Sequence, residues 1–103
     1  MNISVKTEGN KAIIFFEGNV VASIAEDVKN ALNSILANDN IKNLEIDFSK
    51  VEIIDSVGII IIIDCYNILQ QKEGTIAIKN VNDNIKRVFS LMNLDAHFAI
   101  DSV

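Results

Sequence analysis

Residues 52–66 read EIIDSVGIIIIIDCY, and they decide the fold because they could form either a buried strand or the start of a helix. Isoleucine is β-branched and favours strands. However, Asp55 and Ser56 are residue types that cap helix N-termini, and the apolar stretch continues for about 15 residues, which is long for a strand. A strand is already expected at residues 44–48, and a helix would supply the crossover to a parallel neighbour. We therefore predict a helix over residues 57–72.

This helix would divide its side chains between two faces. The face expected to pack on a sheet consists of Val57, Ile61, Ile62, Cys65, Ile68 and Leu69. The opposite face carries Ser56, Ile59, Ile60, Ile63 and Asn67. Two interpretations of this second face remain open. Either another segment of the chain covers it, or it is an exposed apolar patch that binds a protein partner.

The rest of the chain predicts strands that alternate with helices. Strands are expected at residues 3–8, 11–17, 44–48, 75–79 and 97–100. The first alternates as an edge strand does, and the second is apolar enough to be covered on both faces. Apolar residues spaced three and four apart predict further helices at 28–36 and 85–92. This order predicts one α/β domain over residues 1–103, with a mixed, mostly parallel sheet and helices packed on it.

Short local motifs mark where these elements begin and end. They are a hairpin turn at Gly9-Asn10, a capping box formed by Ser23 and Glu26, a left-handed helix cap at Gly74, an N-cap at Asn82 or Asp83 and a left-handed terminator at Asn93. Each motif predicts a boundary of the helices and strands named above.

Composition excludes several classes of function. The 103 residues carry a net charge of -5, which argues against binding nucleic acid or an anionic membrane. The isoleucine run is far shorter than the roughly 20 apolar residues of a spanning helix, so no direct membrane insertion is expected. A single cysteine and an opening without a secretory signal predict a cytoplasmic protein. A partner with a basic rim is compatible with the acidic charge.

Residues that could support catalysis are scattered. His97 is the only histidine and has no cluster of ligands around it in the sequence, and no Gly-rich phosphate loop is present. A carboxylate pair of Asp47 and Asp55, or a triad using Ser56 and His97, has no supporting spacing. Cys65 is expected to be an inert buried thiol. We therefore expect no catalytic residue, no metal site and no cofactor.

The segment Ile46-Asp47-Phe48-Ser49, followed after a short gap by Ile54-Asp55-Ser56-Val57-Gly58, resembles the core motif of STAS domains. The resemblance is to the bacterial anti-sigma factor antagonists in particular. It extends to Gly18-Asn19-Val20 before the first helix, to residues 74–78 and to residues 85–98, so it covers nearly the whole chain.

The resemblance implies a binding module, not an enzyme, that acts in transcription regulation by partner-switching. In that family a partner serine kinase, which is also the anti-sigma factor, phosphorylates the serine of the motif. The unphosphorylated form binds this kinase and releases the sigma factor, phosphorylation ends the binding, and a PP2C-type phosphatase reverses it. On this chain the phosphoacceptor would be Ser56. The implied partner-binding residues are Asn19, Asp55, Ser56, Val57, Gly58, Ile59, Ile60 and Ile63.

Three positions differ from many relatives. Val57 replaces a small residue, Ile60 replaces a glycine, and the loop after Gly18 lacks an acidic residue. The missing loop acid, together with the isoleucine-rich face predicted for the helix, motivates an alternative, a STAS-type scaffold or accessory subunit of a signalling or lipid-transport complex. A small-molecule-binding or enzymatic α/β domain is a third hypothesis.

Two of the motif residues also have purely structural interpretations. Ser56 could be a plain N-cap, and Asp55 either a cap or a group that orients Ser56 for its kinase.

Overall fold

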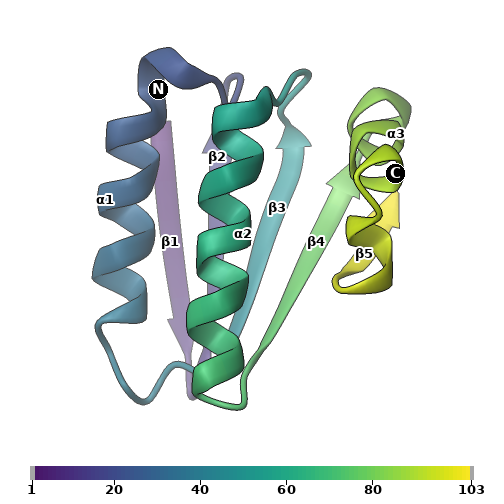
Figure 1. Ribbon diagram of the computed structural model, residues 1–103. Helices are drawn as coiled ribbons and strands as arrows, with labels where there is room; N and C mark the ends of the chain where they lie inside the picture. The colour runs from purple at the N-terminus through teal and green to yellow at the C-terminus, as the bar shows by residue number, and fades with distance from the viewer. Residues whose placement is uncertain (1, 103) are drawn as a thin grey trace.

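One five-stranded sheet carries the helices on a single face (Figure 1). The computed structural model describes residues 2–102. They form β1 (Asn2–Glu8), β2 (Lys11–Glu17), η1 (Ala22–Ile24), α1 (Ala25–Leu36), β3 (Asn43–Lys50), α2 (Ser56–Gln71), β4 (Thr75–Val81), α3 (Asp83–Leu91), η2 (Leu94–Ala96) and β5 (Ala99–Ser102). The strand order is β1-β2-β3-β4-β5, with β1 antiparallel to β2 and the other pairs parallel. The predicted α/β fold with a mixed, mostly parallel sheet is confirmed.

The sheet is covered on one face only, so the prediction that both faces of residues 11–17 are covered is wrong. Alternate residues of β2 are buried under the helices, whereas Phe15 on the other face is 39% exposed. That open face carries charged pairs instead of a second layer. Nζ of Lys11 lies 3.1 Å from Oε1 of Glu45, and Nζ of Lys79 lies 2.5 Å from Oδ2 of Asp101. A half-solvated face of this kind alternates buried and polar side chains along each strand.

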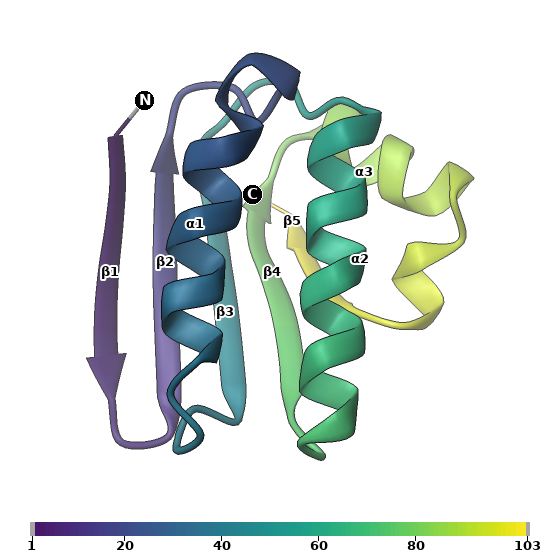
Figure 2. The ribbon, with the colours of Figure 1, turned by 60° about the vertical axis from the view of Figure 1, so that its left-hand side comes forward.

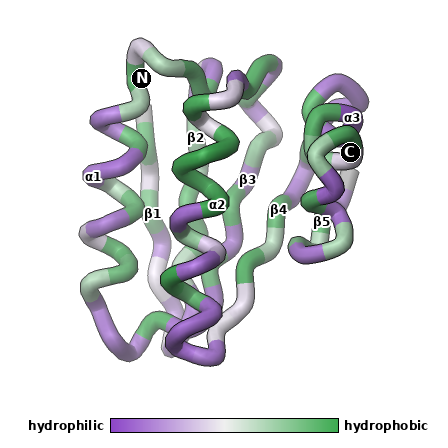
Figure 3. The backbone as a smooth tube through the Cα atoms, viewed as in Figure 1, coloured by the Kyte–Doolittle hydropathy of each residue, from purple (hydrophilic) through white to green (hydrophobic). Residues whose placement is uncertain are grey.

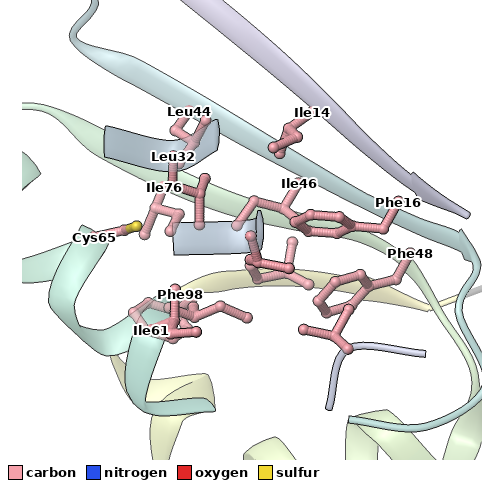
Figure 4. Packing of buried hydrophobic residues seen from close by; sticks show 14 of the residues in the cluster. Ile14, Phe16, Leu32, Leu44, Ile46, Phe48, Ile61, Cys65, Ile76 and Phe98 are labelled. Atoms are coloured by element: carbon pink, nitrogen blue, oxygen red, sulfur yellow. The ribbon is translucent and has the colours of Figure 1, made fainter. Parts of the chain in front are cut away.

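The core lies between the sheet and the helices, and aromatic rings link its parts. Phe16 of β2 and Phe48 of β3 have ring centroids 6.0 Å apart (Figure 4). Phe48 also lies 6.4 Å from Phe89 of α3, which in turn lies 6.2 Å from Phe98. These separations are typical of aromatic pairs that pack favourably. The chain of contacts ties α3 and the C-terminal strand to the centre of the sheet.

The isoleucine run forms the first half of α2, as predicted. Figure 3 shows that the N-terminal half of this helix is its apolar half. The predicted division into faces is partly wrong, because Ile59 is 0% exposed and Val57 is 37% exposed. α1 packs along α2 (Figure 2). On α2, the ring centroid of Tyr66 lies 5.1 Å from that of Phe98. With neighbours beside it as well as a sheet beneath it, α2 buries a wider arc than a single sheet contact would.

The predicted capping box at Ser23 and Glu26 is wrong. Ser23 lies inside the short helix η1, and neither η1 nor the following α1 is capped by the side chain of its own N-cap residue, Val21 or Ile24. Their N-terminal N–H groups therefore need another acceptor.

Gly74 is required for a different reason from the one predicted. The left-handed residue after α2 is Glu73, with φ of 59°, not Gly74. A Cβ on Gly74 would lie 2.1 Å from the carbonyl oxygen of Lys42. Glycine is present there because the two backbones approach closely.

Other predicted boundaries are confirmed. Gly9 in the hairpin turn has φ of 61°, Asn82 caps α3 by accepting from the N–H of Ile85, and Asn93 is left-handed. The last strand was predicted two residues early, because His97 ends η2 instead of starting β5. Within residues 2–102, no helix has both the length and the apolar composition needed to cross a membrane.

Candidate functional site

The loop after β2 and the loop after β3 are joined side by side at one end of the sheet. The N–H of Val20 donates to the carbonyl oxygen of Ile53 at 3.0 Å, and the N–H of Asp55 donates to that of Val20 at 3.2 Å. Val20 and Ile54 form a parallel bridge. The backbone pairing of β2 and β3 thus continues beyond both strands and fixes the segment that leads into α2.

Asn19 reinforces this junction with its side chain. Its Oδ1 accepts from the N–H of Glu52 at 3.3 Å and from the N–H of Ile53 at 3.1 Å. The residue is exposed, so it lies at the surface where the sequence predicts a partner contact. Its side-chain oxygen is nevertheless committed to holding the neighbouring loop.

The carboxylate of Asp55 holds the N-termini of two helices. Oδ1 accepts from the N–H of Gly58 at 3.0 Å and caps α2. Oδ2 accepts from the N–H of Ala22 at 2.9 Å, at the first residue of η1. The N–H groups of Gly58 and Ala22 lower the pKa of Asp55 because both hydrogen bonds favour the ionised carboxylate. Asp55 therefore supplies the cap that Ser23 does not.

Ser56 is the first residue of α2, and its side chain is exposed. The cap is Asp55, so Ser56 stands one position inside the helix instead of being the plain N-cap. Unpaired N–H groups and the positive end of the helix dipole surround such a position. An anionic group attached to this hydroxyl would lie in a favourable electrostatic environment.

Gly58 is buried, and it lets α2 approach the loop after β2. A Cβ at this position would lie 2.7 Å from the carbonyl oxygen of Val20 and 2.8 Å from Cγ1 of Ile54. Glycine is required at this position because the helix and the loop approach closely. Gly58 and Ile59 are both buried beneath the exposed surface of the site, so neither presents a side chain there for the predicted partner contact.

An apolar surface adjoins Ser56 on α2. Val57 is 37% exposed and Ile60 is 55% exposed, and Ile63 is half-buried. We call these three residues the isoleucine patch. Ile60 lies four residues after Ser56 and Ile63 seven after it, so both share the side of the helix that carries the hydroxyl.

A groove of about 570 Å³ lies at the same end of the sheet, lined by Glu52, Ile53, Asn82, Asp83 and Asn84. Its carboxylates make this part of the surface acidic. Ile53, in the loop that leads to Asp55, is 54% exposed.

The other residues singled out in the sequence lie apart from this site. Asp47, on the open face of the sheet, accepts from the N–H of Ser49 and from the side-chain amide of Asn80. Cys65 is 3% exposed, and burial raises the pKa of its thiol to about 12. Among residues 2–102, no three His, Cys, Asp or Glu side chains are grouped as metal ligands would be.

We predict that Gly58→Ala destabilises the domain. In an exposed helix this change stabilises by about 1 kcal/mol, whereas here the added methyl group meets a backbone carbonyl and should cost about 1–3 kcal/mol. Urea unfolding followed by circular dichroism measures the difference. Asn67→Ala on the exposed side of α2 is the control and should change stability by less than about 0.5 kcal/mol. A stabilised Gly58→Ala variant would contradict the close approach.

We also predict a pH-dependent loss of stability in Asp55→Asn. The amide of asparagine can accept only one of the two N–H groups. The folded-state pKa of Asp55 is lowered, so the ionised carboxylate stabilises the fold fully above its unfolded pKa of about 3.9. That contribution disappears as the pH falls through the lower folded-state value.

Thermal unfolding of wild type and Asp55→Asn between neutral and acidic pH tests this. The melting temperatures should differ at neutral pH and converge in acid. Asp64→Asn, an exposed carboxylate further along α2, should follow the wild type throughout. A gap between wild type and Asp55→Asn that is independent of pH would show that the charge of Asp55 is irrelevant.

Comparison with known proteins places this geometry in a family. A model of the STAS domain matches residues 2–103. The anti-sigma-B factor antagonists of Listeria monocytogenes and Listeria innocua are each 27% identical over 106 residues, covering 100% of this chain and 92% of theirs.

Solved structures share the fold. A Thermotoga maritima protein, described as a candidate anti-sigma factor antagonist, has a TM-score of 0.90 at 23% identity, with 98% of this chain and 86% of that chain covered. The Bacillus cell fate determinant SpoIIAA in its phosphorylated form has a TM-score of 0.79 at 14% identity, with 99% and 92% covered. This chain, in which the carboxylate of Asp55 accepts two backbone hydrogen bonds and Ser56 is exposed, belongs to the STAS domain family.

Proposed function

We propose that this protein is an anti-sigma factor antagonist, switched by phosphorylation of Ser56. In its unphosphorylated form it binds an anti-sigma factor that is also a serine kinase, and the sigma factor is released. A PP2C-type phosphatase restores this form by hydrolysing the phosphate ester. The observation that carries the proposal is an exposed serine at the N-terminus of α2, directly beside exposed apolar side chains. The names of the Listeria relatives support the same role.

The isoleucine patch supplies the attractive part of the proposed interface. Val57 and Ile60 expose apolar surface that gains free energy when a partner removes it from water. Exposed apolar groups gathered beside polar ones are typical of protein-binding surfaces. The hydroxyl of Ser56 is small and neutral, so a partner can close over it and the patch together.

Phosphorylation would reverse this attraction without unfolding the domain. The transfer joins Oγ of Ser56 to the γ-phosphorus of ATP, releases ADP, and passes the hydroxyl proton to the kinase or to water. The product carries about -1.5 to -2 charges at neutral pH. The positive end of the α2 dipole can accommodate these charges in the free protein, although Asp55 already accepts from the N–H of Gly58. A closed interface would have to desolvate them beside the negative Asp55, which opposes binding.

The loop after β2 contributes differently in this protein from what its relatives suggest. Residues 19–21 read Asn-Val-Val and offer no carboxylate, and the oxygen of Asn19 already holds the loop after β3. We therefore assign to this loop a mainly positioning role. Recognition by the kinase then depends on Ser56, the patch and the adjoining acidic groove.

Phosphate transfer tests the proposed acceptor. The protein is incubated with ATP and the anti-sigma factor kinase of its source, and intact mass is measured. We expect a single added phosphate on wild type and none on Ser56→Ala. Ser23→Ala, which removes an exposed hydroxyl from the neighbouring η1, should be phosphorylated like wild type.

Two results would overturn this assignment. One is equal phosphorylation of Ser56→Ala and wild type. The other is a wild-type protein that neither accepts phosphate nor binds the kinase, which would favour the scaffold or accessory-subunit alternative.

Measurements of binding to the anti-sigma factor test the role of the isoleucine patch. We predict that Ile60→Glu weakens binding to the anti-sigma factor by at least about tenfold, because a charge replaces an apolar contact in the centre of the interface. Isothermal titration calorimetry measures the dissociation constants. Leu91→Glu changes a more exposed residue, 79% accessible on α3, and should alter the constant by less than about twofold. Equal losses in both variants would remove the patch from the interface.

A further inference from the structure

β1 leaves one long edge of the sheet bare. It is the first strand in the order and pairs only with β2 among the described residues. Figure 2 shows β1 lying outside α1, beyond the cover of any drawn helix. Backbone N–H and C=O groups on such an edge form a template for another strand. The feature is distant from Ser56, which begins α2, and it is independent of the proposed switch.

An apolar groove runs along this edge on the helix-bearing face. It has a volume of about 360 Å³ and is lined by Val5 and Thr7 of β1, Ala31 and Ile35 of α1, and Ile41, among others. Val5 lies opposite Ile14, a fully buried residue, yet Val5 itself is 46% exposed. The helix-bearing face of β1 therefore lacks cover at Val5, whereas Ile3 on the same face packs against the core.

Charges on the opposite face of the sheet alternate toward the same edge. Lys11 lies 3.1 Å from Glu45, and Glu8 is the register partner of Lys11. This row runs from negative Glu45 through positive Lys11 to negative Glu8 at the bare edge. A strand added beside β1 would continue the alternation if it placed a cation opposite Glu8.

We propose that β1 pairs antiparallel with β1 of a second copy of this chain, about a two-fold axis at Thr7. In this register Lys6 of each copy lies opposite Glu8 of the other, so the charge row continues in both directions. Val5 lies opposite Gly9, which has no side chain to block it. Because β1 ends at Glu8, three residues of each strand, 6 to 8, pair directly, and these pairs join the two sheets edge to edge.

The charges distinguish this register from its neighbours. An axis at Lys6 would place the two Lys6 side chains opposite each other, which is unfavourable. An axis at Val5 would place Lys6 opposite Ser4 and leave Glu8 without a cation on the added strand. Only the axis at Thr7 matches both charges of each β1 with opposite charges.

Sedimentation velocity of the full chain, from about 10 µM to about 1 mM, measures the association. We expect a concentration-dependent monomer–dimer equilibrium. Lys6→Glu alone and Glu8→Lys alone should each raise the dissociation constant by about tenfold, because each places like charges opposite each other twice. An equimolar mixture of the two variants should dimerise like wild type, because both contacts then pair opposite charges.

Cysteine cross-linking tests the register. Directly opposed residues in antiparallel strands have Cα atoms about 4.5–5.5 Å apart, within the range of a disulfide. Thr7→Cys should therefore form a covalent dimer on mild oxidation, whereas Val5→Cys should not. Wild type is the control for the buried Cys65, and circular dichroism checks that each variant is folded.

Three results would overturn the proposal. A wild-type protein that stays monomeric throughout the range would mean that Lys6 and Glu8 protect the edge instead of pairing it. A mixture of charge variants that associates no better than either variant alone would remove the charge contacts. Cross-linking through Val5→Cys but not Thr7→Cys would place the axis elsewhere.

Discussion

The two hydrogen bonds accepted by the carboxylate of Asp55 set the geometry of the site. One carboxylate oxygen holds the first turn of α2, and the other holds the N-terminus of η1, which leads into α1. Both helices start at the same end of the sheet, so a single side chain fixes how they begin relative to each other. Together with the backbone pairing of Val20, that anchor holds the exposed hydroxyl of Ser56 in a fixed position relative to the loop after β2.

The backbone around Asp55 supports this anchor. Val20 both donates to and accepts from the loop after β3, and Gly58 brings the helix against Val20 without a side chain between them. The junction is therefore closed by main-chain contacts, and the surface above it is left to exposed side chains. Such a division suits a binding site whose chemistry changes by modification while the fold beneath stays constant.

Local sequence predicted much of the fold because several of its determinants are local. The N-caps at Asp55 and Asn82, the left-handed Asn93 and the hairpin glycine each act within a few residues. Local sequence predicts Asn93 and Gly9 outright and narrows each N-cap to two adjacent residues. The errors arose where a distant partner decides the outcome. Ser23 has the spacing of a capping box, yet an aspartate 33 residues away from Ala22 supplies the acceptor.

The same reason explains the misplaced faces of α2. Helical periodicity alone gives the direction of Ile59 and Val57 relative to each other, but not which neighbours surround the helix. The contacts of α2 with α1 and with Phe98 come from segments remote in sequence. The local pattern predicts Gly74 as a left-handed cap, whereas the glycine is required by the carbonyl oxygen of Lys42 from another loop. A local sequence pattern cannot predict a close approach of this kind, because the second backbone comes from a distant segment.

The engagement of Asp55 limits what it can do in the proposed phosphorylation. Both of its oxygens already accept N–H groups, and its lowered pKa makes it a weak proton acceptor. An aspartate adjacent to a reactive serine would otherwise be the natural candidate for general base. In the proposed phosphorylation, the group that takes the hydroxyl proton is therefore the kinase or water, and Asp55 acts by positioning Ser56.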